Sequence, residues 1–251
     1  MSNENSGSGL SSSLTDLMAS LAVIFILLFV AQLNYYGKKG ELTRGDILAH
    51  LQKQLEQFTR PGDNGIRVLM DPRDPLSVLI IVPEGLLNFA VDKADISSVG
   101  KQFLRAFIPR LADAICEHES IRGDISLIVV EGHADSTGTE TGNLPLSQER
   151  SMRVTVEGLR LLPDEPNHGC FRDLLSASGR GSAQPILTEA IAGYAAHSNL
   201  GLVNQDELVR RLSELAVEDK DRSRRVVFKI RVRSLEQQHL IGAIEGANGK
   251  R

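Results

Sequence analysis

The sequence predicts an α/β protein that consists of a single N-terminal transmembrane helix followed by one folded domain. The 23 positions from Leu14 to Tyr36 are almost all apolar, and Asp16 is the only charged residue among them. Coiled as a helix, this run is about 34 Å long, enough to cross a hydrocarbon core of ~30 Å. Downstream, short runs of β-branched residues alternate with runs of helical periodicity, a pattern typical of α/β domains.

These patterns divide the 251 residues into five segments. They are a short tail (1–13), the transmembrane helix (14–36), an amphipathic linker helix (37–65), the folded domain (66–233) and a C-terminal tail (234–251). The first tail has no Lys or Arg and so lacks the basic start of a secretory signal peptide, and we expect the helix to be retained. A net charge of -4 argues against direct binding of nucleic acid.

Asp16 stands near the entrance of the apolar run, and two interpretations of it remain open. As a helix cap, beside Ser12, Ser13 and Thr15, its carboxylate would bond free backbone N–H groups at the helix start. As a residue inside the bilayer boundary, it would bind and release a proton.

The residues after the apolar run are basic and include two glycines. By the positive-inside rule, Lys38, Lys39 and Arg44 would place this side of the membrane in the cytoplasm. Gly37 and Gly40 are expected to end the first helix. In the next stretch, apolar residues recur at helical spacing, at Leu48, Leu51, Leu55 and Phe58. This seam either packs on the chain's own domain or forms a dimeric stalk.

The folded domain is expected to form one sheet with helices on one face, an α/β sandwich. Strand-like residues occupy 66–70, 77–82, 124–131, 174–178 and 226–232. Helical periodicity occupies 96–115, 147–161 and 205–217, and Asn204 is a good cap for the last of these. The first two strands form a hairpin across the turn at 71–75. Residues 188–203 are an insertion, and the role of 188–221 stays open.

The two cysteines, Cys116 and Cys170, leave three possibilities open. They would form a disulfide in an exported domain, or stay as thiols in a reducing compartment. With His118 and His168 they would also make a zinc set of two cysteines and two histidines, although the C-x-H spacing differs from the usual zinc patterns. No metal site is predicted on this basis.

Four ordered motifs carry the functional signal, the first two of them adjacent in the chain. The first is Gly132-His133-Ala134-Asp135-Ser136-Thr137-Gly138, followed by Asn143, Leu146, Ser147 and Arg150. The others are Ser178-Gly179-Arg180-Gly181-Ser182-Ala183-Gln184-Pro185 and Arg222-Ser223-Arg224-Arg225-Val226. With these motifs the chain resembles the OmpA-like peptidoglycan-binding domain family over 77–233, although Ala134 and Ser223 depart from the family's usual Thr and Asn. The resemblance implies an OmpA-like α/β sandwich.

The resemblance also implies a site for peptidoglycan stem peptides, which in Gram-negative bacteria carry diaminopimelate. This residue presents an ammonium and a carboxylate, so its receptor needs a fixed acid and a fixed guanidinium. Asp135 is expected to bind the ammonium and Arg150 the carboxylate, while Asn143 and Leu146 shape the pocket. His133 is expected to be a structural histidine.

The basic motif at 222–225 has two interpretations, because its arginines would either contact anionic glycan or form a solvated strand end. The sequence contains no G-x-S-x-G elbow, P-loop or HExxH motif. We therefore expect a binding module without a cofactor rather than an enzyme.

A transmembrane helix with an acidic entrance before an OmpA-like domain resembles the MotB family, the wall-anchored subunits of proton-driven rotary stators. Residues 13–18 and 22–25 look most similar to the MotB-like subunits of the Zorya anti-phage defence system. The basic tail and Y-x-D helix that are usual in flagellar subunits are absent from this sequence. The resemblance implies an inner-membrane protein with a cytoplasmic N-terminus and a periplasmic domain, which overrides the charge rule at Lys38 and Lys39.

The same resemblance implies three partners: a ring of MotA-like membrane subunits, a second copy of this chain, and peptidoglycan. It implies that Asp16 carries the transported proton, with sodium as the alternative ion. The competing hypotheses are a flagellar-type stator subunit and a static tether between the inner membrane and peptidoglycan.

Overall fold

The computed structural model describes residues 7–59, 65–90, 92–162, 168–187 and 218–233, and in the first helix it describes side chains from 17 to 32 and from 44 onward. The helices are α1 (Gly7–Gln54), a 3-10 turn η1 (Glu56–Phe58), α2 (Glu84–Leu87), α3 (Ser98–Cys116), α4 (Glu119–Asp124), α5 (Glu140–Arg160), α6 (His168–Leu174) and α9 (Lys220–Ser223). The strands are β1 (Arg67–Met70), β2 (Ser77–Pro83), β3 (Ile125–His133), β4 (Leu175–Gly179) and β5 (Arg225–Val232).

The five strands form one mixed sheet in the order β1-β2-β5-β3-β4. β1 and β2 form the expected hairpin, and the pair β3–β4 is parallel. The last strand in the chain, β5, lies between β2 and β3 and is antiparallel to both. All five predicted strands are confirmed.

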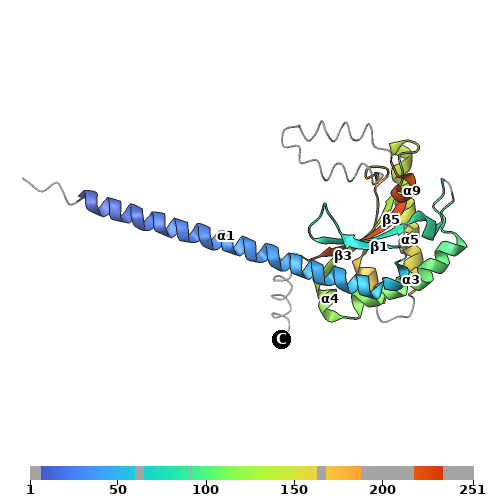
Figure 1. The fold of residues 1–251 in the computed structure, drawn as a ribbon, viewed down its shortest axis with the longest axis horizontal. Coiled ribbons are helices and arrows are strands. Elements are labelled where there is room, and N and C mark those ends of the chain that lie inside the picture. The colour runs from blue at the N-terminus through green and yellow to red at the C-terminus, as the bar shows by residue number, and fades with distance from the viewer. Residues whose placement is uncertain (1–6, 60–64, 91, 163–167, 188–217, 234–251) are drawn as a thin grey trace, which may run out of the picture.

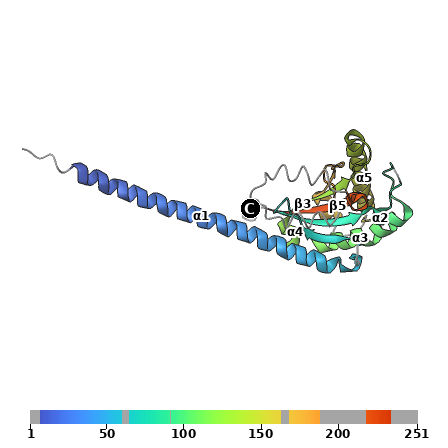
Figure 2. The same cartoon turned by 45° about the horizontal axis from the view of Figure 1, so that its top comes forward.

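The helices that build the core cover one face of the sheet (Figures 1 and 2). Phe107 of α3 lies 5.4 Å from Phe228 of β5, measured between ring centroids. The C-terminal part of α1 lies against this layer, where Leu51 of α1 and Leu55 just after the helix are fully buried. The predicted α/β sandwich with helices on one face is confirmed, and the seam of the linker packs on its own domain.

Helix α1 is continuous where the sequence predicts a break. It runs from Gly7 to Gln54, through Gly37 and Gly40. Glycine keeps its backbone N–H, so each one weakens a helix by only about 1 kcal/mol relative to alanine and does not end it. Because the helix begins nine residues before Asp16, the interpretation of Asp16 as a helix cap is also wrong.

The first half of α1 projects away from the domain (Figure 1), and its described side chains from 17 to 32 are all exposed. In the part of the chain that the structure describes, no helix offers an apolar stretch long enough to cross a membrane. The predicted span, 14–36, includes positions at both ends whose side chains lie outside the described residues. The transmembrane helix therefore stays a prediction.

Helix α5 begins at Glu140, seven residues before the start that periodicity predicts. Thr139 caps it, because its hydroxyl accepts a hydrogen bond from the backbone N–H of Gly142 at 3.2 Å. Pro145 lies inside the helix. Because proline is disfavoured in helix interiors, the sequence predicts a start after it. The short helices α2, α4, α6 and α9 span less than two turns and leave no periodic signal. The predicted insertion at 188–203 and helix at 205–217 lie outside the described residues.

A disulfide joins Cys116, the last residue of α3, to Cys170 in α6, with 6.1 Å between the Cα atoms. This result decides between the three possibilities that the sequence leaves open. Among the described residues, no group of three or more His, Cys, Asp or Glu side chains is arranged to hold a metal ion. The bond ties two helices of the core layer together across 54 residues of chain.

Replacing both cysteines with serine is expected to lower the free energy of unfolding by about 2–4 kcal/mol, because the unfolded chain loses a cross-link that closes a long loop. Urea denaturation of the full chain in detergent, followed by circular dichroism, measures the change. The reduced wild type should match the serine variant, and the serine variant should not respond to reductant. A variant as stable as the oxidised wild type would contradict the expectation.

Candidate functional site

The candidate site lies at one edge of the sheet, where three strand ends meet. Because β5 is antiparallel to both neighbours, its first residue pairs with the last residues of β2 and β3. The residues just beyond these ends are Glu84, Asp135 and Arg224. The sheet thus joins Glu84 and Arg224, which are 140 positions apart in the chain, in one ion pair.

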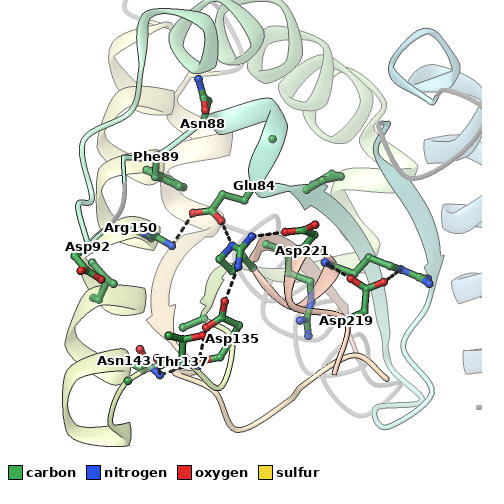
Figure 3. Close-up of a pocket in the computed structure, with 18 of the residues that line it drawn as sticks. Glu84, Asn88, Phe89, Asp92, Asp135, Thr137, Asn143, Arg150, Asp219 and Asp221 are labelled. Carbon is green, nitrogen blue, oxygen red and sulfur yellow. Dashed lines mark hydrogen bonds and ion pairs between the residues drawn. The ribbon is translucent and has the colours of Figure 1, made fainter. Parts of the chain in front are cut away.

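A pocket of about 1450 Å³ opens at this edge, and all the binding residues predicted from the sequence line it: Asp135, Asn143, Leu146 and Arg150. It exceeds the roughly 300–1,000 Å³ of ordinary small-molecule sites, so it has room for part of an extended polymer. In Figure 3, Glu84, Asp135 and Arg150 point toward a common space from three different elements.

Asp135 is held by two contacts on the loop that follows β3. Its Oδ1 accepts a hydrogen bond from the backbone N–H of Thr137 at 2.7 Å, and its Oδ2 accepts one from Nη1 of Arg224 at 2.5 Å. Burial by itself would raise the pKa of Asp135, but the bonds from Arg224 and Thr137 bring that pKa below its ordinary value. The carboxylate is therefore charged at neutral pH.

Arg150 approaches the pocket from the inner face of α5 and is almost fully buried. Its Nε donates to the backbone carbonyl of Lys93 at 2.9 Å, and its Nη1 forms an ion pair with Oε1 of Glu84 at 2.9 Å. Its guanidinium carbon also lies 4.9 Å from the centre of the Phe89 ring, a cation–π contact. Three groups thus fix the position of this guanidinium.

Glu84 and Arg224 stand between the two predicted binding residues. Nε of Arg224 donates to Oε2 of Glu84 at 2.6 Å, and the same guanidinium contacts Asp135 and Asp221. Sequence reasoning missed Glu84 and Phe89 and left Arg224 undecided. The signal for Glu84 is an acid immediately after a strand, but it has meaning only once the strand order is known.

Asn143 and Leu146, on the first turns of α5, shape the pocket in different ways. The side-chain amide of Asn143 donates to the backbone carbonyls of Asp135 at 3.0 Å and Thr137 at 2.9 Å, so it holds the loop in place. Gly138 ends this loop at a φ of +88°, which favours glycine. Leu146 is half-buried in the pocket wall.

Strand β3 packs closely on α5 beside the site. A Cβ atom at Gly132 would overlap the backbone carbonyl of Ser147, so only glycine allows this approach. The hydroxyl of Ser147 accepts a hydrogen bond from the backbone N–H of Gly181 at 2.9 Å, which joins the second motif to the first. The glycine at position 132 is therefore explained by packing rather than by ligand contact.

His133 does not line the pocket, as expected for a structural histidine. Its buried ring lies 3.7 Å from Oε2 of Glu131, measured from Nε2, and burial lowers the pKa of His133. Glu131 also accepts hydrogen bonds from Arg180. Burial alone would raise the pKa of Glu131, but the nearby His133 ring and the hydrogen bonds from Arg180 lower that pKa to about 2.

The Glu131→Gln variant tests this buried pair. Because the folded pKa of about 2 lies below the ordinary value of 4.5, the charged form of Glu131 stabilises the fold above pH 4.5, and this stabilisation is lost as the pH falls toward 2. We expect the variant to lose roughly 3 kcal/mol of stability at pH 7 and to lose less than the wild type on acidification.

Urea denaturation at pH 7, 4 and 3 measures both effects. Glu149→Gln is the matched control, because Glu149 forms an exposed ion pair with Arg153 and its loss should change stability by less than about 1 kcal/mol. Parallel pH profiles for the wild type and Glu131→Gln would contradict the expected role of Glu131.

The chemistry of the pocket suits a ligand that carries both charges. It offers a fixed carboxylate at Asp135 and a fixed guanidinium at Arg150, each held by contacts of its own. Charge-assisted hydrogen bonds to such groups are about twice as strong as neutral ones. The arrangement can recognise a zwitterion such as an amino-acid centre.

Comparisons with known proteins add to this geometry. No protein-family model matches the sequence. The chain is 24% identical over 231 residues to the Zorya protein ZorB of Escherichia coli, a match that covers 87% of this chain and 86% of that protein.

Two solved structures are also similar. A MotB-like protein from Desulfovibrio vulgaris is 17% identical, with a TM-score of 0.44, over 80% of this chain and 95% of the other. The periplasmic domain of Helicobacter pylori MotB is 15% identical, with a TM-score of 0.43, over 73% and 92%. The resemblance to Zorya proteins that residues 13–18 and 22–25 predict is confirmed, because over most of its length this chain is similar to a ZorB protein.

Proposed function

We propose that this chain is the peptidoglycan-anchored subunit of a proton-driven rotary motor in the bacterial inner membrane. The motor is of the MotAB stator type and corresponds to the ZorA–ZorB complex of anti-phage defence. The observation that carries the proposal is the placement of Asp135 and Arg150 at one pocket, in a chain similar to ZorB along 87% of its length. The pocket binds the cell wall, and the first helix carries the ion.

The wall-binding half rests on charge and shape. The ammonium of diaminopimelate binds Asp135, its carboxylate binds Arg150, and Leu146 packs against the stem peptide. The size of the pocket favours a polymer over a small metabolite. The disulfide between Cys116 and Cys170 supports a periplasmic location for the domain, because such bonds persist in oxidising compartments.

The membrane half rests on the exposed surface of α1. Large apolar side chains from Leu17 to Val30 are exposed all around the helix, and the domain covers none of them. A helix that is apolar on every side needs an apolar environment, which the bilayer and MotA-like partner helices supply. Two copies of this chain stand inside a ring of such partners, each with its N-terminus in the cytoplasm.

Asp16 is the ion-carrying residue in this proposal. It lies within α1 rather than at its start, which leaves its carboxylate without the role of a helix cap. Protonation of Asp16 changes its charge and alters the contacts of α1 with the surrounding ring, and the wall-bound domain provides the fixed point against which the ring turns. Sodium is the alternative ion.

Peptidoglycan binding is tested with Asp135→Ala and Arg150→Ala in pull-down on purified cell-wall sacculi. Each variant loses a charge-assisted contact worth about 1.5–3 kcal/mol, so binding should weaken by about tenfold or more. Arg153→Ala is the matched control, since it removes the same charge one turn along α5 from an exposed side chain. Arg150→Lys guards against a folding defect, because it keeps the charge. Unchanged binding in the Asp135 and Arg150 variants would rule out the pocket as the wall site.

The motor role is tested with Asp16→Asn in cells challenged with phage. A proton-driven motor should lose protection by orders of magnitude in plaque counts, because asparagine cannot exchange a proton, while the assembly with its membrane partner stays intact in co-purification. Asp16→Glu, which keeps the carboxylate, should retain more protection than the asparagine variant. Normal protection by Asp16→Asn would favour the static tether instead.

A further inference from the structure

Four charged side chains in the pocket form one continuous chain of alternating sign. Asp135 binds Arg224, Arg224 binds Glu84, and Glu84 binds Arg150, with distances of 2.5, 2.6 and 2.9 Å between the bonded atoms. The two residues at the ends, Asp135 and Arg150, are those expected to bind the ligand. Each of them is therefore occupied by a side chain of the protein itself.

The ends of this chain are held in place without the middle. Asp135 keeps its bond from the backbone N–H of Thr137, and Arg150 keeps its bond to the carbonyl of Lys93 and its contact with Phe89. If Arg224 and Glu84 moved away, the Asp135 carboxylate and the Arg150 guanidinium would still point into the pocket. The ends are thus ready for a ligand before it arrives.

The middle pair is the exchangeable part. The side chain of Arg224 is 33% exposed, against 9% for Asp135 and 7% for Arg150. When it leaves Asp135, Arg224 still has Glu84 and the exposed Asp221 as partners. Its displacement therefore strands no buried charge, which would otherwise be the dominant cost.

From this network we propose that Arg224 and Glu84 are internal competitors that occupy the ligand site in the free protein. This inference rests on the proposed binding of a zwitterionic stem-peptide residue at Asp135 and Arg150. The ligand's ammonium replaces Arg224 on Asp135, and its carboxylate replaces Glu84 on Arg150. The displaced residues remain paired with each other, so each of the four charges in the network has a partner before and after binding.

This exchange makes the pocket selective for ligands with both charges. A cation alone would displace Arg224 but leave Glu84 on Arg150, and an anion alone would leave Arg224 on Asp135. Only a ligand with an ammonium and a carboxylate at the right spacing opens both ends at once. Because of the internal pairs, the apparent affinity equals the affinity of the free site multiplied by the fraction of molecules in which the site is free.

The test uses the full chain in detergent and meso-diaminopimelate as the probe, with affinity measured by isothermal titration calorimetry. If Arg224 competes for Asp135, Arg224→Ala should bind the probe about tenfold more tightly than the wild type. Arg224→Gln is the second variant, because it keeps a hydrogen-bonding side chain beside Glu84 but removes the charge. Arg231→Ala, an exposed arginine near the other end of β5, is the charge-matched control and should bind like the wild type.

Each outcome decides the question. Tighter binding by either Arg224 variant supports the inference, including the case in which the wild type gives no measurable heat and the variant does. Weaker or unchanged binding in both variants, while the wild type binds, makes Arg224 a direct contact or a bystander and overturns the inference alone. If the wild type and all variants bind neither the probe nor sacculi, the proposed wall site and this inference are both overturned.

Discussion

The pairing of β5 between β2 and β3 is the contact on which the whole site depends. Its antiparallel register places the start of β5 beside the ends of two strands that lie far apart in the chain. Glu84 at the start of α2, Asp135 on the loop after β3 and Arg224 just before β5 then meet within hydrogen-bonding distance. The core side chains of β5, such as Phe228 in the middle of the strand against Phe107, hold β5 in this position. The pocket is therefore assembled by the same strand pairing that builds the sheet.

The sequence predicts the elements of this fold better than their arrangement. Short strand-like runs, most of them rich in β-branched residues, identify all five strands, and the motif around Asp135 and Arg150 identifies residues that do line one pocket. The position of β5 in the sheet is decided by tertiary packing between residues far apart in the chain. The local periodicity of apolar residues therefore does not predict it. Glu84 is hidden for the same reason, since an acid after a strand is common and gains meaning only from its neighbours. The break expected at Gly37 and Gly40 is wrong because propensity is a weak local preference.

The charged network from Asp135 to Arg150 is fully paired within the protein, and this pairing reconciles two demands on the proposed wall anchor. Exposed charges that wait for a ligand would bind salts and unrelated ions, and buried charges without partners would destabilise the domain. The network from Asp135 to Arg150 avoids both problems because every charged group has a partner inside the protein. The buried carboxylate of Glu131 is likewise paired, with Arg180, but neither of these residues lines the pocket.

The unbroken course of α1 has a mechanical meaning. A glycine break between the apolar half and the seam at Leu51 and Leu55 would act as a swivel, so that twisting or tilting at one end would be absorbed before it reached the other. A continuous helix of 48 residues, about 72 Å long, has no such joint. The seam at Leu51 and Leu55 is buried in the domain core, so the distal half of α1 and the sheet are joined without a flexible link. In the proposed complex, a force on the membrane end of α1 would therefore reach the wall-bound domain directly.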